Sequence, residues 1–173
     1  MTCDMDIQNI YNSIAELSRE IVRECTARSV KISTAESCTG GMISGAVTSI
    51  SGSSAVIELG VCSYSNRIKH EILHVPAEVL KQFTEYSVEC AAEMAKGVME
   101  LSGADYGVST TGVAGPTGGS AEHPVGEVCI AVSGRNGCRS ERFLFTHGSA
   151  DRELIRALAA EKALSMLLCE IKK

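Results

Sequence analysis

The 173-residue sequence has no stretch that approaches the roughly twenty apolar residues of a membrane-spanning helix. Residues 1–4 lack the basic region and the apolar run that open a signal peptide. Internal repeats, low-complexity segments and a linker between domains are also absent. We therefore expect a cytoplasmic protein that folds as a single domain over residues 1–173.

Basic residues are not in excess either, because the sequence has 16 Lys and Arg but 21 Asp and Glu. The formal net charge of −5 at pH 7 gives no support for the concentrated basic face with which proteins replace the counterions of nucleic acids or anionic membranes. We expect neither nucleic acid nor a membrane as a partner, and any anionic ligand must be small and locally held. The content of 45% hydrophobic and 21% charged residues is that of an ordinary folded chain.

Cysteine is not scarce, with eight residues, but the C-x-x-C spacing of metal and redox sites is absent. Most of the cysteines fall within apolar, periodic segments. Cysteine-rich disulfide frameworks belong mainly to short secreted chains. We expect most of these cysteines to be small core residues rather than disulfide partners.

The chain alternates between helical and strand periodicity. Helices are predicted for residues 6–26 and 42–50, on either side of Pro76, from Ser87 to Gly103, and after Asp151. Strands are predicted for residues 30–34, 55–64 and 106–111, followed by a hairpin around Asn136-Gly137. This alternation predicts a three-layer α/β domain with a mixed sheet. Ligands of such sheets bind at loops that follow the strands, and three loops qualify: 35–41, 64–69 and 111–119.

The string His70-Glu71-Ile72-Leu73-His74 matches H-E-x-x-H, the zinc-binding helix of metalloproteases. Such a helix must run through both histidines, yet Pro76 disfavours helical geometry just past His74. The other histidines, His123 and His147, have no ligand-like spacing. We interpret the string as accidental, expect no metal, and keep a zinc hydrolase built on His70 and His74 as the less favoured alternative.

Ser37 lies on a predicted strand-to-helix turn, where its hydroxyl can project while the following backbone N–H groups point at the same place. The N–H groups of Cys38, Thr39, Gly40 and Gly41 would lie at the positive end of a helix, which suits an oxyanion or a phosphate. This geometry favours Ser37 as a nucleophile. The same residues also fit a plain helix cap, and Cys38 is a rival nucleophile because a helix N-terminus lowers the pKa of a thiol.

A serine nucleophile needs a proton acceptor, and no histidine is well placed by sequence to be one. A lysine can accept the proton if burial or a nearby positive dipole lowers its pKa, as in Ser-Lys pairs. Lys69 follows a strand that adjoins a candidate loop, and Tyr64 could hydrogen-bond the amine or relay a proton. Taken alone, both side chains also fit ordinary surface residues.

Residues 112–119 form a glycine-rich loop that matches neither the P-loop nor G-x-G-x-x-G. Its glycines would let backbone amides approach a bound phosphate or sugar. At the start of the last predicted helix, Arg152 could clamp a carboxylate or a phosphate with two hydrogen bonds. A plain loop and a solvated arginine are the alternatives for these two features.

Seven stretches occur in order over nearly the whole chain: A-E-S-C-T-G-G at 35–41, G-S-S at 52–54, Y-S-N-x-x-K at 64–69, V-P at 75–76, T-G-V-A-G-P-x-G-G at 111–119, P-V-G-x-V at 124–128 and D-R at 151–152. Together they resemble the CinA C-terminal domain family, which includes nicotinamide-nucleotide amidases. The resemblance implies an α/β/α sandwich with a mixed, mostly parallel sheet. It also implies an amidase, without metal or cofactor, that converts nicotinamide mononucleotide to nicotinate mononucleotide and ammonia.

The resemblance also implies roles for individual residues. Ser37 would be the nucleophile, Lys69 the general base and Tyr64 its helper. Thr39, Gly40 and Gly41 would correspond to the oxyanion and ligand loop. The positions expected around the nucleotide are Asn66, Thr111, Gly112, Ala114, Gly115 and Arg152. A homodimer is the implied assembly.

The sequence departs from the family pattern in several places. The N-terminal domain of many relatives does not occur in these residues, so we expect its activity to be missing. Ser51 stands where the family often has proline, and Tyr86-Ser87-Val88 replaces a run of small residues before the long helix. Neither change touches Ser37 or Lys69, so both bear on substrate preference more than on reaction class. A non-catalytic nucleotide-binding module is the main alternative function.

Overall fold

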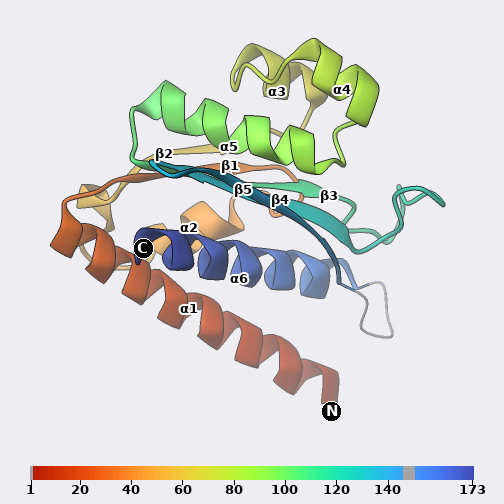
Figure 1. Ribbon diagram of the computed structural model, residues 1–173. Helices are drawn as coiled ribbons and strands as arrows, with labels where there is room; N and C mark the ends of the chain where they lie inside the picture. Colours follow the sequence, from red (N-terminus) through yellow and green to blue (C-terminus); the bar gives the residue numbers. More distant parts are fainter. Residues whose placement is uncertain (1, 146–150) are drawn as a thin grey trace.

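The computed structural model of the protein describes residues 2–145 and 151–173, and within them a single mixed sheet has the strand order β2-β1-β3-β4-β5 (Figure 1). Its strands are β1 (Ile32–Glu36), β2 (Ile57–Cys62), β3 (Tyr106–Gly112), β4 (Glu127–Gly134) and β5 (Gly137–Leu144). β1 pairs in parallel with β2 and β3, whereas β4 is antiparallel to β3 and β5. Only β4 therefore runs against the common direction, which confirms a mixed, mostly parallel sheet.

Helices cover both faces of the sheet, which confirms the three-layer α/β/α architecture (Figure 1). On one face lie α5 (Val88–Ser102) and, farther out, α3 (Asn66–Glu71) and α4 (Ala77–Phe83). On the other face lie α2 (Met42–Thr48) and α6 (Arg152–Ile171), and α1 (Thr2–Arg28) packs outside α6. A 3-10 turn, η1 (Ser53–Ala55), leads into β2.

The core has a large cluster under α6 and a smaller one under α5. The large cluster joins α1, α2 and α6 to the sheet and includes Ile21, Val47, Ile130 and Leu164. The smaller cluster includes Met94 of α5 with Leu73 and Val75, the residues between α3 and α4. Because Leu73 and Val75 are anchored there, the short helix α3 is held at a fixed place above the sheet.

Local signals set the ends of the two long helices that the sequence predicted most closely. The Ser87 side chain accepts a hydrogen bond from the backbone N–H of Cys90 at the start of α5, and Gly103 ends that helix with φ 69°. The Asp151 side chain caps α6 through the backbone N–H of Glu153. These side-chain acceptors pair backbone N–H groups that a helix start leaves free. The predicted starts of these two helices, at Ser87 and after Asp151, are confirmed.

Other predicted boundaries were displaced. β1 begins at Ile32 and continues to Glu36, two residues beyond the prediction, because its polar residues are buried in the middle of the sheet. In the hairpin Gly134 pairs with Gly137, so the two turn residues are Arg135 and Asn136 instead of Asn136-Gly137. α1 extends past both ends of the predicted 6–26.

The prediction that most cysteines are core residues holds for four of the seven whose side chains are described. All seven cysteines whose side chains are described are free. Four are buried, as expected for core residues: Cys25, Cys38, Cys90 and Cys129. Three are exposed: Cys62, Cys138 and Cys169. No helix in the described part of the chain is long and apolar enough to cross a bilayer.

Candidate active site

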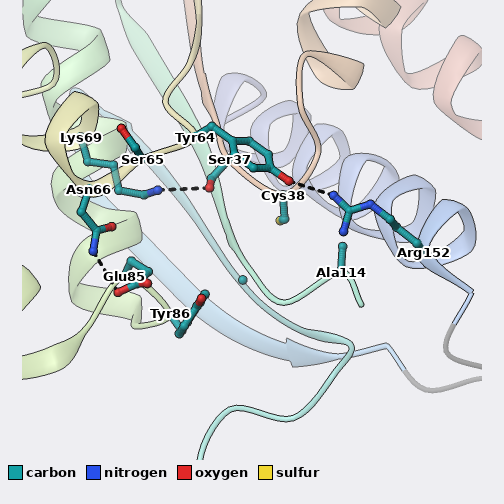
Figure 2. A pocket seen from close by; sticks show the side chains of 11 residues that line it. Ser37, Cys38, Tyr64, Ser65, Asn66, Lys69, Glu85, Tyr86, Ala114 and Arg152 are labelled. Carbon is teal, nitrogen blue, oxygen red and sulfur yellow. Dashed lines mark hydrogen bonds between the residues drawn. The ribbon is translucent and has the colours of Figure 1, made fainter. Parts of the chain in front are cut away.

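The three predicted ligand loops meet at one pocket, beyond the carboxyl ends of the adjacent strands β2, β1 and β3 (Figure 2). Its volume is about 360 Å³. The residues that line it are Ser37, Cys38, Tyr64, Ser65, Asn66, Lys69, Glu85, Tyr86, Gly112, Ala114 and Arg152. Parallel strands deliver their carboxyl ends to the same edge of a sheet, which explains why segments far apart in sequence converge here.

Ser37 is the first residue after β1 and is 9% exposed. Its backbone N–H donates to the carbonyl of Thr110 on β3 at 2.9 Å, and its carbonyl accepts from the N–H of Gly40 at 3.2 Å. The first bond ties Ser37 to the sheet and the second closes a tight turn. The Ser37 hydroxyl is thereby held at the pocket wall (Figure 2).

Lys69 is 1% exposed although it lies on the short helix α3. Its Nζ donates to Ser37 Oγ at 3.1 Å (Figure 2). It also donates to the carbonyl of Ser63 at 2.9 Å. Burial lowers the pKa of Lys69, and the negative charge of Glu85 opposes part of that shift. The structure thus brings the two predicted residues Ser37 and Lys69 into direct contact.

A buried carboxylate that the sequence did not single out organises the turn after Ser37. The Glu36 carboxylate accepts hydrogen bonds from the backbone N–H groups of Gly41 at 3.0 Å, Ile43 at 3.0 Å and Ser44 at 2.8 Å. The Thr39 hydroxyl donates to the same carboxylate at 2.7 Å. Glu36 therefore occupies the positive end of α2, which was predicted to face a ligand.

Thr39, Gly40 and Gly41 consequently lie beside the pocket and not on its wall. Thr39 is fully buried, the Gly40 N–H is used in the turn, and the Gly41 N–H is bound to Glu36. Arg156 of α6, which the sequence did not flag, secures the same turn. Its guanidinium donates to the carbonyls of Cys38 at 3.2 Å and Thr39 at 2.7 Å.

Cys38 lines the pocket next to Ser37, but its chemistry does not suit a nucleophile. Burial raises the pKa of the Cys38 thiol to about 12. A thiol with that pKa is almost wholly protonated at neutral pH, and only the thiolate is strongly nucleophilic. The environment therefore favours Ser37 over the rival thiol.

Tyr64 and Arg152 form the opposite side of the pocket from Lys69 (Figure 2). The Arg152 guanidinium donates to the Tyr64 hydroxyl at 2.9 Å and to the carbonyl of Gly115 at 2.7 Å. Tyr64 is 64% exposed, and among the described residues its hydroxyl has no hydrogen bond to Lys69. Tyr64 thus contacts Arg152, the predicted anion clamp, instead of the predicted base.

Asn66 lines the pocket at the start of α3, where its side-chain amide donates to the Glu85 carboxylate at 3.1 Å. Thr111 lies behind the wall and donates its hydroxyl to the Glu85 carbonyl at 2.6 Å. Glu85 and Tyr86 belong to the connection between α4 and α5, which was not predicted to reach the site. The departure from the family pattern at Tyr86 was the one sequence signal for this part of the wall.

The glycine-rich loop contributes Gly112 and Ala114 to the pocket, while Gly115 supports Arg152 through its carbonyl. A Cβ atom at Gly112 would lie 2.2 Å from the carbonyl oxygen of Glu127. Only glycine allows β3 and β4 to approach so closely where the loop begins. The close approach of the Gly112 backbone to Glu127 fixes the start of the loop, where it enters the site.

The H-E-x-x-H string does not form the helix that a zinc site requires. α3 ends at Glu71, and His74 has a left-handed backbone with φ 56°. His70 Nδ1 lies 2.8 Å from the carbonyl of Val75, so this ring is engaged in local structure. His123 pairs with Glu127 at 2.9 Å, and His147 falls outside the described residues. The geometry counts against the zinc hydrolase.

A sequence model of the CinA C-terminal domain matches residues 14–171. The chain belongs to the CinA C-terminal domain family. A CinA-like protein of Geotalea daltonii is 47% identical over 140 residues, which make up 81% of this chain and 33% of that protein. An Enterobacter agglomerans protein named nicotinamide-nucleotide amidohydrolase PncC is 44% identical over 161 residues, 91% of this chain and 95% of that protein. The chain thus spans about a third of the length of the first CinA-like relative and nearly all of PncC.

Solved structures of CinA relatives share the fold of this chain. The competence/damage inducible protein CihA of Agrobacterium tumefaciens is 41% identical, with a TM-score of 0.88 over 93% of this chain and 96% of that one. A CinA superfamily protein of Klebsiella pneumoniae is 33% identical, with a TM-score of 0.86 over 92% and 98% of the two chains. Family membership and fold therefore agree with the resemblance that the sequence motifs suggested.

Proposed function

We propose that the protein is a nicotinamide-nucleotide amidase, which hydrolyses the carboxamide of nicotinamide mononucleotide to nicotinate mononucleotide and ammonia. The observation that carries the proposal is the 3.1 Å contact between Lys69 Nζ and Ser37 Oγ inside the pocket. The relative of E. agglomerans, which matches nearly the full length of this chain, supports the choice of substrate through its name.

In the proposed reaction, neutral Lys69 takes the proton of the Ser37 hydroxyl as Oγ attacks the carboxamide carbon. The carbonyl of Ser63, which accepts from Nζ, orients the amine toward Ser37. The tetrahedral adduct collapses when Lys69 returns a proton to the departing nitrogen, so ammonia leaves and an acyl-serine remains. Water then attacks the ester with Lys69 as base, which releases the carboxylate product and restores Ser37.

Backbone donors next to Ser37 are proposed to stabilise the oxyanion. The N–H groups of Cys38 and Thr39 donate to no backbone carbonyl among the described residues, whereas Gly40 donates to the Ser37 carbonyl and Gly41 to the Glu36 carboxylate. The N–H of the residue after a nucleophile is a common oxyanion donor. Thr39, Gly40 and Gly41 thus shape the loop, and its donors come from the first two residues after Ser37.

The remaining residues of the pocket are proposed to hold the nucleotide. Arg152 lies opposite Lys69, where its guanidinium can bind the phosphate of the substrate. Tyr64, Asn66, Gly112 and Ala114 line the space between the two ends. Thr111 and Gly115 act from behind the wall, through the hydrogen bonds that they make to Glu85 and Arg152.

The proposal is tested by ammonia release from nicotinamide mononucleotide with the purified wild type, Ser37→Ala, Lys69→Ala and Cys38→Ala. Loss of the nucleophile or the base should lower the rate roughly a thousandfold or more. Cys38→Ala should keep most of the activity, because its thiol takes no part in the mechanism. If Ser37→Ala were as active as the wild type, the serine mechanism would be wrong. If the wild type released no ammonia, the alternative of a non-catalytic nucleotide-binding module would be favoured.

Compartment and assembly also belong to this proposal. A protein whose seven described cysteines are all free fits the reducing cytoplasm. The homodimer implied by the family resemblance is checked by size-exclusion chromatography with light scattering, for which we expect twice the mass of the chain.

A further inference from the structure

Two walls of opposite charge face each other across Ser37. Figure 2 shows Arg152 and Tyr64 on one side of the serine, and Glu85 with Asn66 and Tyr86 on the other. The guanidinium is fixed by Gly115 and Tyr64 at 2.7 and 2.9 Å, and the carboxylate is fixed by Asn66 at 3.1 Å. The pocket is therefore polarised from end to end, with the nucleophile between the two charges.

The charge on Glu85 is built into the site. Burial opposes ionisation of this half-buried carboxyl, yet its pKa is lowered because its own backbone N–H, the Asn66 amide and the Tyr86 hydroxyl favour the charged form. The same charge raises the pKa of Lys69 against the effect of burial, which is the reverse of what a lysine base needs at neutral pH. Glu85 therefore presents a negative charge at this end of the pocket, and the nearby Lys69 also favours that charge.

Tyr86 adds an aromatic surface beside that carboxylate. Its ring packs against His123 with a centroid separation of 5.3 Å and an interplanar angle of 51°, and Tyr86 itself lines the pocket. Carboxylates and aromatic faces are the groups with which proteins bind organic cations. A metal ion does not fit this wall, because no group of three metal-ligating side chains occurs in the described part of the chain.

We propose that the Glu85–Tyr86 wall selects substrates whose scissile carboxamide sits on a positively charged aromatic ring, while Arg152 takes an anionic group at the other end. This inference rests on the proposed amidase function and sharpens it. The oxidised pyridinium nucleotide should be preferred over its reduced dihydropyridine form, which carries the same phosphate but no ring charge.

The test measures binding in a Ser37→Ala background, so that neither nucleotide is consumed. Isothermal titration calorimetry gives the dissociation constants of nicotinamide mononucleotide and of its reduced form with Glu85 intact and with Glu85→Gln. With Glu85 intact, we expect the dissociation constant of the oxidised form to be lower than that of the reduced form by a factor of about ten or more. Glu85→Gln should remove most of this preference by weakening only the oxidised form. Glu89 is an exposed glutamate of α5 outside the pocket, so Glu89→Gln is the matched control. This variant should change neither dissociation constant.

The outcomes separate this inference from the proposed function. Equal weakening of both nucleotides by Glu85→Gln, or no preference with Glu85 intact, overturns the role of the wall even if the wild type releases ammonia. A preference lost in Glu85→Gln, with no hydrolysis by the wild type, supports the wall and overturns the amidase proposal. Binding of neither nucleotide overturns both.

Discussion

Lys69 is the residue whose protonation state decides whether the proposed chemistry can run. Burial lowers its pKa, so the amine loses its proton at a lower pH than an exposed lysine does. Activity that depends on the neutral amine is absent at low pH and rises as the pH passes through the lowered pKa. We expect kcat/KM for ammonia release to follow this acid limb in assays between about pH 5 and pH 10.

The control for this profile is Lys69→Arg, which keeps a positive charge but cannot give it up. This variant should be inactive over the whole range. A wild-type profile that stays flat on the acid side would contradict the assignment of Lys69 as the base.

Substitution of Tyr64 distinguishes two roles for its hydroxyl, as a helper of the base Lys69 or as a support for Arg152. Its hydroxyl contacts Arg152 at 2.9 Å, so Tyr64→Phe should raise KM for nicotinamide mononucleotide and leave the acid limb in place. Arg152→Ala should raise KM about 10- to 100-fold, the loss expected for a hydrogen bond to a charged group. Neither variant should change KM for nicotinamide riboside, which lacks the phosphate. A shifted acid limb in Tyr64→Phe would instead show that Tyr64 acts on Lys69.

At the scale of single residues, the sequence predicted side chains that belong to continuous motifs. Ser37 and Lys69 are such residues, and the structure brings them together. Glu36, Glu85 and Arg156 were missed because their roles depend on the folded chain. The Arg156 guanidinium, for example, secures carbonyls 117 and 118 residues away in sequence. No local pattern carries that information.

At the scale of elements, α2 and the turn before it depend on one carboxylate. Glu36 is fully buried and accepts from the backbone N–H groups of Gly41, Ile43 and Ser44. Glu36→Gln would turn an amide group toward these donors and leave some of them unpaired. We expect a loss of about 2–4 kcal/mol in the free energy of unfolding, and a lower kcat because Ser37 starts the same turn.

Urea unfolding measures the loss, and an unchanged slope of free energy against urea shows that the folded and unfolded states are comparable. The matched control is Glu58→Gln on the edge strand β2, where the exposed Glu58 pairs with Lys31. That change should cost less than about 1 kcal/mol, as surface ion pairs do. Equal losses in the two variants would refute the role of Glu36 as the cap of α2.

Elements whose ends are marked locally were predicted well. Ser87 with Gly103 bounds α5, and Asp151 starts α6, because a cap is a contact between neighbours in sequence. β1 was displaced because Ala35 and the polar Glu36, both beyond the predicted end, are fully buried and pair with β2 and β3. Burial of that kind depends on strand order, which hydrophobic periodicity does not report.

For the whole molecule, the pocket joins segments that are distant in the chain. Ser37 follows β1, Lys69 lies on α3 and Arg152 begins α6. A ligand that contacts all three segments binds the folded chain and has no site on the unfolded one. Binding should therefore stabilise the fold as a unit, and the predicted single domain should unfold in one transition with or without ligand.

Thermal unfolding of Ser37→Ala with nicotinamide mononucleotide tests this coupling without turnover. At a free ligand concentration of about one hundred times Kd, mass action adds about 2.7 kcal/mol to stability. For a domain of this size, that corresponds to a rise in Tm of roughly 5–10 °C. Inorganic phosphate at the same concentration should give little shift, and adding Arg152→Ala should reduce the rise at fixed ligand. Two separate transitions, only one of which moves with ligand, would mean that the loops around Ser37, Lys69 and Arg152 do not belong to one cooperative unit.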